Sequence, residues 1–131
     1  WNKFAQEASE AKLKAREALK APRSADLLGL DDAAFRSFFS ASPVKRIGRD
    51  CFIRNVLIAA GNSGRESLAP ACERLASDAS PLVRGAAVWS LSRLLGGRAF
   101  AALAQRLRPA ENDREVLEEW DHALARAGVP A

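Results

Sequence analysis

The feature that most constrains this chain is a set of helical segments that recur at nearly constant spacing. The pair Ile53-Arg54 recurs 30 residues later as Val83-Arg84, and Gly64-Arg65 recurs 33 residues later as Gly97-Arg98. A third set recurs at an offset of 33: Val83, Ala87, Ser90 and Leu91 correspond to Val116, Trp120, Ala123 and Leu124. No segment alternates apolar and polar residues as a strand would. This period predicts an all-α fold, an α-α superhelix in which each helix pair packs against its neighbours.

Residues that start and stop helices mark the units of this repeat. Ser42-Pro43 and Ser80-Pro81 place a capping serine before a proline that suits the first turn. Asn112 with Glu115 three residues later predicts another helix start. Gly61-Asn62 and Gly96-Gly97 are typical of helix ends, with Asn62 as a C-cap residue. We therefore expect one helix that begins near residue 32, with an apolar face of Phe35, Phe38 and Phe39, and others over about 43–61, 65–77, 81–95, 98–107 and 113–127.

The first part of the chain differs from the repeat. Residues 1–23 are rich in Ala, Lys and Glu, carry a thin apolar stripe and end near Pro22. An isolated helix of this length is marginally stable unless it packs on something. We expect residues 1–30 to form an arm or linker and residues 31–131 to form the helical repeat domain. The chain begins at Trp1 and contains no methionine, which indicates a piece of a longer protein.

Charge is distributed unevenly along the sequence. Residues 1–108 carry 18 Lys and Arg against 10 Asp and Glu, whereas residues 109–131 carry two Arg against six Asp and Glu. A basic body followed by an acidic last helix suits a polyanion that approaches from one side. A solvated surface of mixed sign is the other interpretation.

The sequence contains little that could perform catalysis or hold a metal. Cys51 and Cys72 lie 21 positions apart, outside any zinc or cluster spacing, and suit reduced core thiols. His122 is the single histidine, and it lacks the partner that would orient it in a catalytic site. Glycine-rich phosphate motifs and apolar runs long enough to span a membrane are absent. We assign no catalytic residue, no metal site, no cofactor and no small-molecule substrate to this chain.

Six cations are candidates for contacts with phosphate. On a helix over 43–61, Lys45, Arg46 and Arg49 fall within an arc of about 100° near the helix start, where they oppose the macrodipole. A solvated helix start is the alternative. Arg54 lies four residues after Asp50, so we expect these two to pair and Arg54, like Arg84, to be structural. Weaker candidates for RNA binding are Arg65, Arg93 and Arg98.

Trp89 and Arg93 form a second candidate site. They are four residues apart on one helix, away from its main apolar face. An aromatic ring beside an arginine can stack an unpaired base. The interpretation that we favour places Trp89 between adjacent repeats with Arg93 over its ring, because a buried solenoid helix has two apolar faces.

Two strings in the sequence resemble known families. DASPLVRGAA, which starts at Asp78, resembles the second-helix opening of HEAT repeats, and the period indicates the short HEAT-like variety. The string SPVKRIGRDCFIRNVLIAAGNSG, followed by SPLVRGAAVWSL, resembles the C-terminal region of epoxyqueuosine reductases. The opening WNKFA is similar to the segment that follows the last cluster-binding Cys-Pro in that family.

The resemblance implies a function for the parent protein. Members of this cytoplasmic family reduce epoxyqueuosine to queuosine at the wobble position of certain tRNAs, with cobalamin and two 4Fe-4S clusters bound by other domains. It implies that this chain is a non-catalytic C-terminal domain that helps to hold the tRNA anticodon arm. Cys51 and Cys72 do not match the cluster cysteines. The alternative is a protein-interaction or scaffolding solenoid with no nucleic-acid role, and structural support of the cluster domain is compatible with either.

Overall fold

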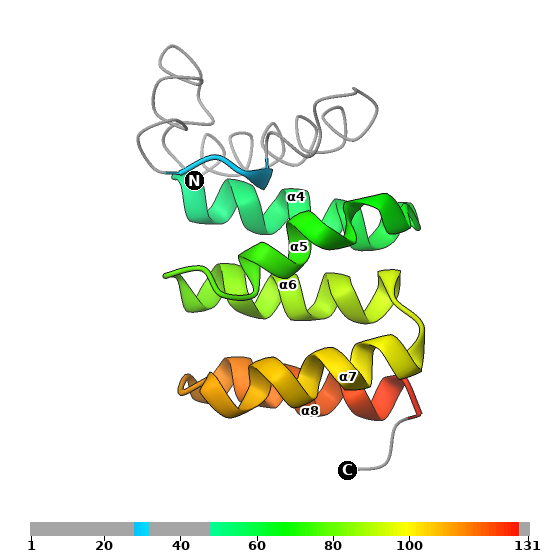
Figure 1. Cartoon of the computed structure of the whole chain (residues 1–131). Helices are drawn as coiled ribbons and strands as arrows, with labels where there is room; N and C mark the ends of the chain where they lie inside the picture. The colour runs from blue at the N-terminus through cyan, green and yellow to red at the C-terminus, as the bar shows by residue number, and fades with distance from the viewer. Residues whose placement is uncertain (1–27, 32–47, 129–131) are drawn as a thin grey trace, which may run out of the picture.

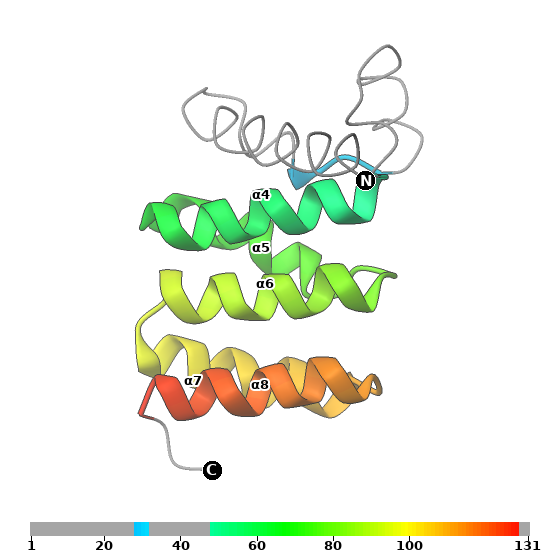
Figure 2. The same cartoon turned by 180° about the vertical axis from the view of Figure 1, so that it is seen from behind.

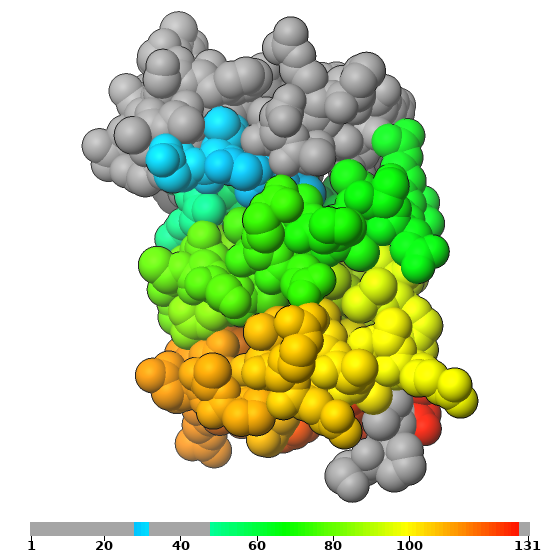
Figure 3. All heavy atoms as spheres, in the orientation of Figure 1, coloured from blue at the N-terminus to red at the C-terminus, as the bar shows by residue number. Residues whose placement is uncertain are grey.

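The computed structural model describes residues 28–31 and 48–128, and its helices lie in two layers (Figure 1). One layer, seen from its own side in Figure 2, consists of α4 (Arg49–Ser63), α6 (Pro81–Leu94) and α8 (Arg114–Arg126). The other layer, which forms the near surface in Figure 3, consists of α5 (Ala69–Leu75) and α7 (Gly97–Leu107). Short 3-10 turns precede α5 and follow α7, at η2 (Glu66–Leu68) and η3 (Arg108–Ala110). The described residues contain no strand, and the predicted all-α superhelix is confirmed.

The core follows the repeat that the sequence predicts. Three equivalent positions on α4, α6 and α8 are buried in every repeat: Ile53, Val83 and Val116; Leu57, Ala87 and Trp120; Ala60, Ser90 and Ala123. The offset of 30 residues and then 33 residues therefore places the same face of each helix against the core. On the outer layer, the Phe100 ring of α7 lies 5.4 Å from the Trp120 ring, centroid to centroid.

Helices α4 and α6 approach each other closely. The buried hydroxyl of Ser90 on α6 donates a hydrogen bond to the Leu57 carbonyl of α4. A Cβ atom at Gly61 would lie 2.7 Å from Cζ3 of Trp89 and 3.1 Å from the Cα atom of Ser90. Real Cβ contacts are not that short, so the absence of a side chain at Gly61 sets the spacing of these two helices.

The ends of α4 differ from the prediction. Gly48 precedes the helix with φ 88°, which is not a helical conformation, so the predicted continuous helix over 43–61 is wrong at this point. The helix runs on through Asn62 to Ser63, and Gly64 at φ 70° takes the left-handed C-cap conformation that we expected of Asn62. Glycine reaches positive φ without the strain that a Cβ adds, which explains why the nearby glycine prevails over the asparagine.

Two further boundaries correct the sequence analysis. The N-cap of α8 is Asp113, whose carboxylate accepts a hydrogen bond from the Val116 N–H at 3.1 Å, and not Asn112. The segment 65–77, predicted as one helix, consists of η2 followed by α5. Pro70 at the start of α5 has no N–H to continue a hydrogen-bonding pattern from the turn before it.

Residues 28–31 pack against α4. Leu28 belongs to the hydrophobic core and is 1% exposed, although it falls within the arm predicted over 1–30. The Leu30 carbonyl accepts a hydrogen bond from Nε of Arg49 at 2.7 Å. The arm over 1–23, the predicted phenylalanine face and the Ser42-Pro43 cap lie outside the described residues, so the domain boundary remains a prediction.

Candidate functional site

Arg49 lies at the first turn of α4, where it joins three parts of the chain. Its Nη1 and Nη2 atoms donate to the two carboxylate oxygens of Asp78 at 2.9 and 2.8 Å, and Nη1 also lies 3.2 Å from Asp50. Since Nε donates to Leu30, the guanidinium ties residues 28–31 to the turn before α6. The side chains of Arg49 and Asp78 are 11% and 14% exposed, so this pair is largely removed from water.

The carboxyl of Asp78 titrates below its ordinary range. Burial alone would raise the pKa of Asp78, but hydrogen bonds from the Arg49 guanidinium and the Ser80 N–H outweigh burial and lower it. The pKa of Arg49 is raised, chiefly by its hydrogen bond to Asp78. Asp78 and Arg49 are therefore both charged at neutral pH.

Arg84 repeats this arrangement one repeat later. Its Nε and Nη2 atoms donate to the two carboxylate oxygens of Glu111, in the turn before α8, at 2.9 and 3.0 Å. Its Nη1 atom donates to the backbone carbonyls of Asp78 at 2.9 Å and Ala79 at 3.1 Å. We call the two pairs, Arg49 with Asp78 and Arg84 with Glu111, the arginine ladder. The prediction that Arg84 is structural agrees with these contacts.

The predicted cation trio does not form one helical surface. The non-helical Gly48 separates Arg49 from Lys45 and Arg46, so the helical wheel that placed all three in one arc does not apply. Lys45 and Arg46 lie outside the described residues. The geometry does not favour Arg49 as a phosphate ligand, because its guanidinium is engaged by Asp78, Asp50 and Leu30.

The three weaker candidates share the opposite end of the helix layer. Arg65 directly follows the C-cap of α4, Arg93 lies in the last turn of α6, and Arg98 lies in the first turn of α7. Because α4 and α6 run in the same direction, these positions come to one end of the stack (Figures 1 and 2). All three residues are exposed. We call Arg65, Arg93 and Arg98 the basic edge.

Trp89 and Arg93 adopt the arrangement that we favoured. The guanidinium carbon of Arg93 lies 5.3 Å from the ring centroid of Trp89, within the range of a cation–π contact. The Trp89 ring packs on the backbone of α4 at Gly61 and is half-buried. The ring therefore lies between repeats, and its packing is not that of a free stacking surface for a base.

The sequence analysis misassigned Arg54. It does not pair with Asp50, because Asp50 contacts Arg49 instead. Arg54 is exposed and makes no hydrogen bond or ion pair within the described residues, and it lines a groove between α4, α6 and α8. Its distance from acidic residues on neighbouring helices, which decides this outcome, is not visible in the spacing of one helix.

The described residues do not form a metal centre or a catalytic constellation. No group of three or more His, Cys, Asp or Glu within 28–31 and 48–128 could hold a metal ion. Cys51 is exposed, while Cys72 is buried, and burial raises the pKa of the Cys72 thiol to about 12. Two such cysteines do not fit the thiolate ligand set of a 4Fe-4S cluster. No helix in the described part of the chain combines the length and apolar character needed to cross a bilayer.

Comparison with known proteins identifies relatives of one kind. A protein named epoxyqueuosine reductase from Alicycliphilus denitrificans is 36% identical over 101 residues, which cover 71% of this chain and 28% of that protein. A protein of the same name from Xanthomonas campestris pv. campestris is 35% identical over 94 residues, covering 71% and 26%. The chain thus spans about a quarter of the length of these relatives. The resemblance to epoxyqueuosine reductases is confirmed.

A solved structure and a family model support the fold. The crystal structure of epoxyqueuosine reductase with a tRNA-Tyr epoxyqueuosine-modified tRNA stem loop matches with a TM-score of 0.73 at 22% identity. That match covers 81% of this chain and 28% of the other. At this identity the likeness shows the fold. The family model for HEAT repeats matches residues 52–125, more than half of the sequence, and the chain therefore belongs to the HEAT-repeat family.

Proposed function

We propose that this chain is the C-terminal HEAT-like domain of an epoxyqueuosine reductase and that it binds the anticodon arm of the tRNA substrate. The parent protein is cytoplasmic and reduces epoxyqueuosine to queuosine. Its cobalamin and two 4Fe-4S clusters are bound by other domains, because the cysteines of this chain do not fit a cluster. Within this chain, residues 1–30 form the connection to those domains and residues 31–131 form the domain.

The basic edge is the observation that carries this proposal. Arg65, Arg93 and Arg98 are exposed at one end of the stack, on consecutive repeats. Arg98 forms no ion pair with any described residue, so its guanidinium can donate to a phosphate without breaking an internal contact. A row of cations at repeat spacing suits a phosphate backbone, which presents negative charge at regular intervals.

The start of α7 adds to this surface. The helix begins at Gly96-Gly97, and no side chain caps its first turn. Backbone N–H groups there point out of the helix end, where the macrodipole favours an anion. Arg98 stands beside these N–H groups and opposes the same dipole. A phosphate at this position would contact both the guanidinium and the N–H groups.

The test is a binding titration with an anticodon stem-loop of a queuosine-type tRNA at two salt concentrations. The variant replaces Arg65, Arg93 and Arg98 by alanine, both in this chain and in the full-length parent. We expect affinity to fall by roughly tenfold to a hundredfold. We also expect the slope of log K against log salt to flatten by about 0.7 to 0.9 for each phosphate that the variant no longer neutralises.

Arg74 on α5 provides the matched control. It is also an exposed arginine, and it makes no ion pair with a described residue, but it lies on the other layer. Arg74→Ala should leave both the affinity and the salt slope unchanged. Equal effects of the control and the triple variant would show a general charge effect instead of a site. Binding that is absent or insensitive to salt in both the chain and the parent would refute the RNA proposal.

A further inference from the structure

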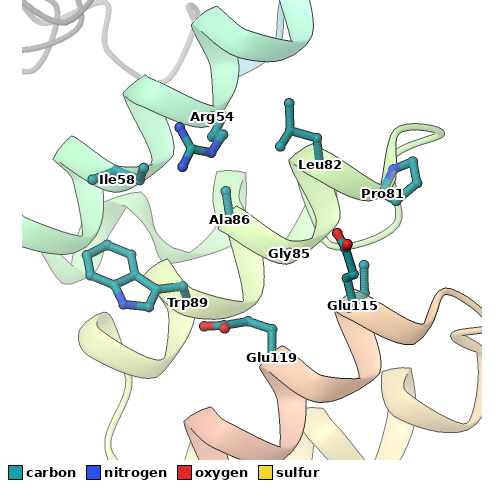
Figure 4. Close-up of a pocket in the computed structure, with 10 residues that line it drawn as sticks. Arg54, Ile58, Pro81, Leu82, Gly85, Ala86, Trp89, Glu115 and Glu119 are labelled. Carbon is teal, nitrogen blue, oxygen red and sulfur yellow. The ribbon is translucent and has the colours of Figure 1, made fainter.

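A groove of about 390 Å³ lies on the face formed by α4, α6 and α8, away from the ladder. Figure 4 shows how it is built: Arg54 and Ile58 extend from α4, Glu115 and Glu119 extend from α8, and α6 runs between them. The groove thus crosses three successive repeats. None of its lining residues belongs to the basic edge.

The floor of the groove is apolar and hollow. Leu82 is 45% exposed and is the one large hydrophobic side chain of the described residues that is exposed to this extent. A Cβ atom at Gly85 would meet nothing within 4 Å, so this glycine leaves open space on the surface of α6. The half-buried Trp89 ring continues the apolar strip along the same helix. An exposed apolar strip with polar margins is typical of a protein-binding surface.

The two walls carry opposite charge. Arg54 on α4 and Glu115 on α8 are exposed, and neither makes an ion pair within the described residues. Glu119 on α8 contacts Arg126 at 3.0 Å and adds a second carboxylate to the acidic wall. An occupant that fits must therefore carry a negative group on one side and a positive group on the other.

We propose that this groove binds a protein segment with a dipolar side-chain pattern. The segment presents an acidic residue to Arg54, an apolar side chain to Leu82 and the space above Gly85, and a basic residue to Glu115 and Glu119. The carboxylates of α8 repel phosphate, so a nucleic acid backbone does not suit this groove. The site is separate from the basic edge, and it neither requires nor excludes the proposed tRNA function.

The proposal is tested by selection from a displayed library of random peptides of about 12 residues, with the whole chain as the target. Enriched peptides should share an apolar residue between an acidic and a basic one. Arg54→Glu should weaken binding of these peptides at least about tenfold, and so should Glu115→Lys. Changing the acidic residue of the peptide to lysine should restore binding to Arg54→Glu, which a merely structural effect would not do.

A steric variant tests the same site without a change of charge. Gly85→Leu fills the open space on α6 with a residue that favours the helical conformation, so the fold should keep or gain thermal stability. It should abolish peptide binding. Arg74→Glu, a charge reversal on the other layer, should not alter it. Thermal unfolding by circular dichroism checks that each variant is folded.

Three outcomes would overturn the proposal. The first is that no peptide is enriched over a blank surface. The second is that the enriched peptides bind equally well to Arg54→Glu, Glu115→Lys and Gly85→Leu. The third is that an RNA stem-loop displaces the peptides and itself loses affinity on Arg54→Glu, which would assign the groove to nucleic acid.

Discussion

The two ends of the α4, α6 and α8 layer use the same residue type for different purposes. At one end, the arginine ladder holds Arg49 and Arg84 against Asp78 and Glu111. At the other end, Arg65, Arg93 and Arg98 stand at the surface. The turns that precede α6 and α8 carry a carboxylate, whereas the turns that follow α4 and α6 consist largely of glycine. The turn sequence of the neighbouring repeat therefore decides whether an arginine is buried in a structural pair or exposed at the surface.

The largest effect is expected where the ladder is broken on one side. Asp78→Ala removes the carboxylate and leaves Arg49, whose side chain is 11% exposed, without its main partner. We expect the free energy of unfolding to fall by about 3 kcal/mol, as for other buried pairs in which one member is removed. Urea unfolding followed by circular dichroism measures this change.

The same measurement on the basic edge sharpens the contrast. Arg98→Ala should change the free energy of unfolding by no more than about 0.5 kcal/mol, as most surface substitutions do. If Asp78→Ala and Arg98→Ala cost the same, the distinction between the two ends would be wrong.

The second prediction concerns the shape of the ladder cations. Arg84→Lys keeps the positive charge but cannot donate to both oxygens of Glu111 and to two backbone carbonyls at once. We expect a loss of about 1 to 2 kcal/mol in the free energy of unfolding. At the basic edge, Arg93→Lys should be close to neutral by the same measurement. A neutral Arg84→Lys would mean that charge alone, and not the planar fork, holds the second pair.

The third prediction uses pH to weaken the ladder. The folded pKa of Asp78 is lowered, so its contribution to stability is present above the unfolded pKa of about 3.9 and is lost as pH falls through the folded pKa. The difference in stability between the parent chain and Asp78→Asn should therefore shrink between pH 7 and the acid limit. Thermal unfolding of both proteins across this range measures it. A difference that stays constant with pH would show that the charge of Asp78 is not what stabilises the turn.

The smallest expected effect lies at the start of α7. Arg98→Glu places a negative charge in the first turn, where the macrodipole favours it, so the free energy of unfolding should rise by about 0.3 to 1 kcal/mol. The same change should weaken binding of the stem-loop. A gain in stability together with a loss of binding would indicate that Arg98 is retained for a function. A loss of both would indicate a structural role that the described contacts do not reveal.

The sequence predicted the helices and the buried face more accurately than the partners of individual charges. The spacing of Ile53, Val83 and Val116 identifies the core face, because helical periodicity and burial are local properties of each segment. The choice between Arg49 and Arg54 was wrong because a helical wheel compares residues on one helix. The partner of Arg49 is Asp78, which lies 29 residues away and is brought close by the stacking of repeats.

Local conformation accounts for the other differences. Gly48 ends the helical continuity that would have joined Arg49 to Lys45 and Arg46, and no pattern of side chains signals its positive φ. The groove lined by Arg54 and Glu115 was not predicted, because its walls come from helices that are far apart in sequence. An unpaired arginine equivalent in the repeat to the paired Arg84 is the one signal that could have pointed to it.

The close contact between Gly61 and Trp89 has a consequence for the history of this fold. A side chain at position 61 would collide with the ring, and the Cα atom of Ser90 lies almost as near. A descendant that acquires a larger residue at position 61 must lose the ring at position 89 or separate the two helices. These two positions should therefore change together across homologues, as one inherited unit.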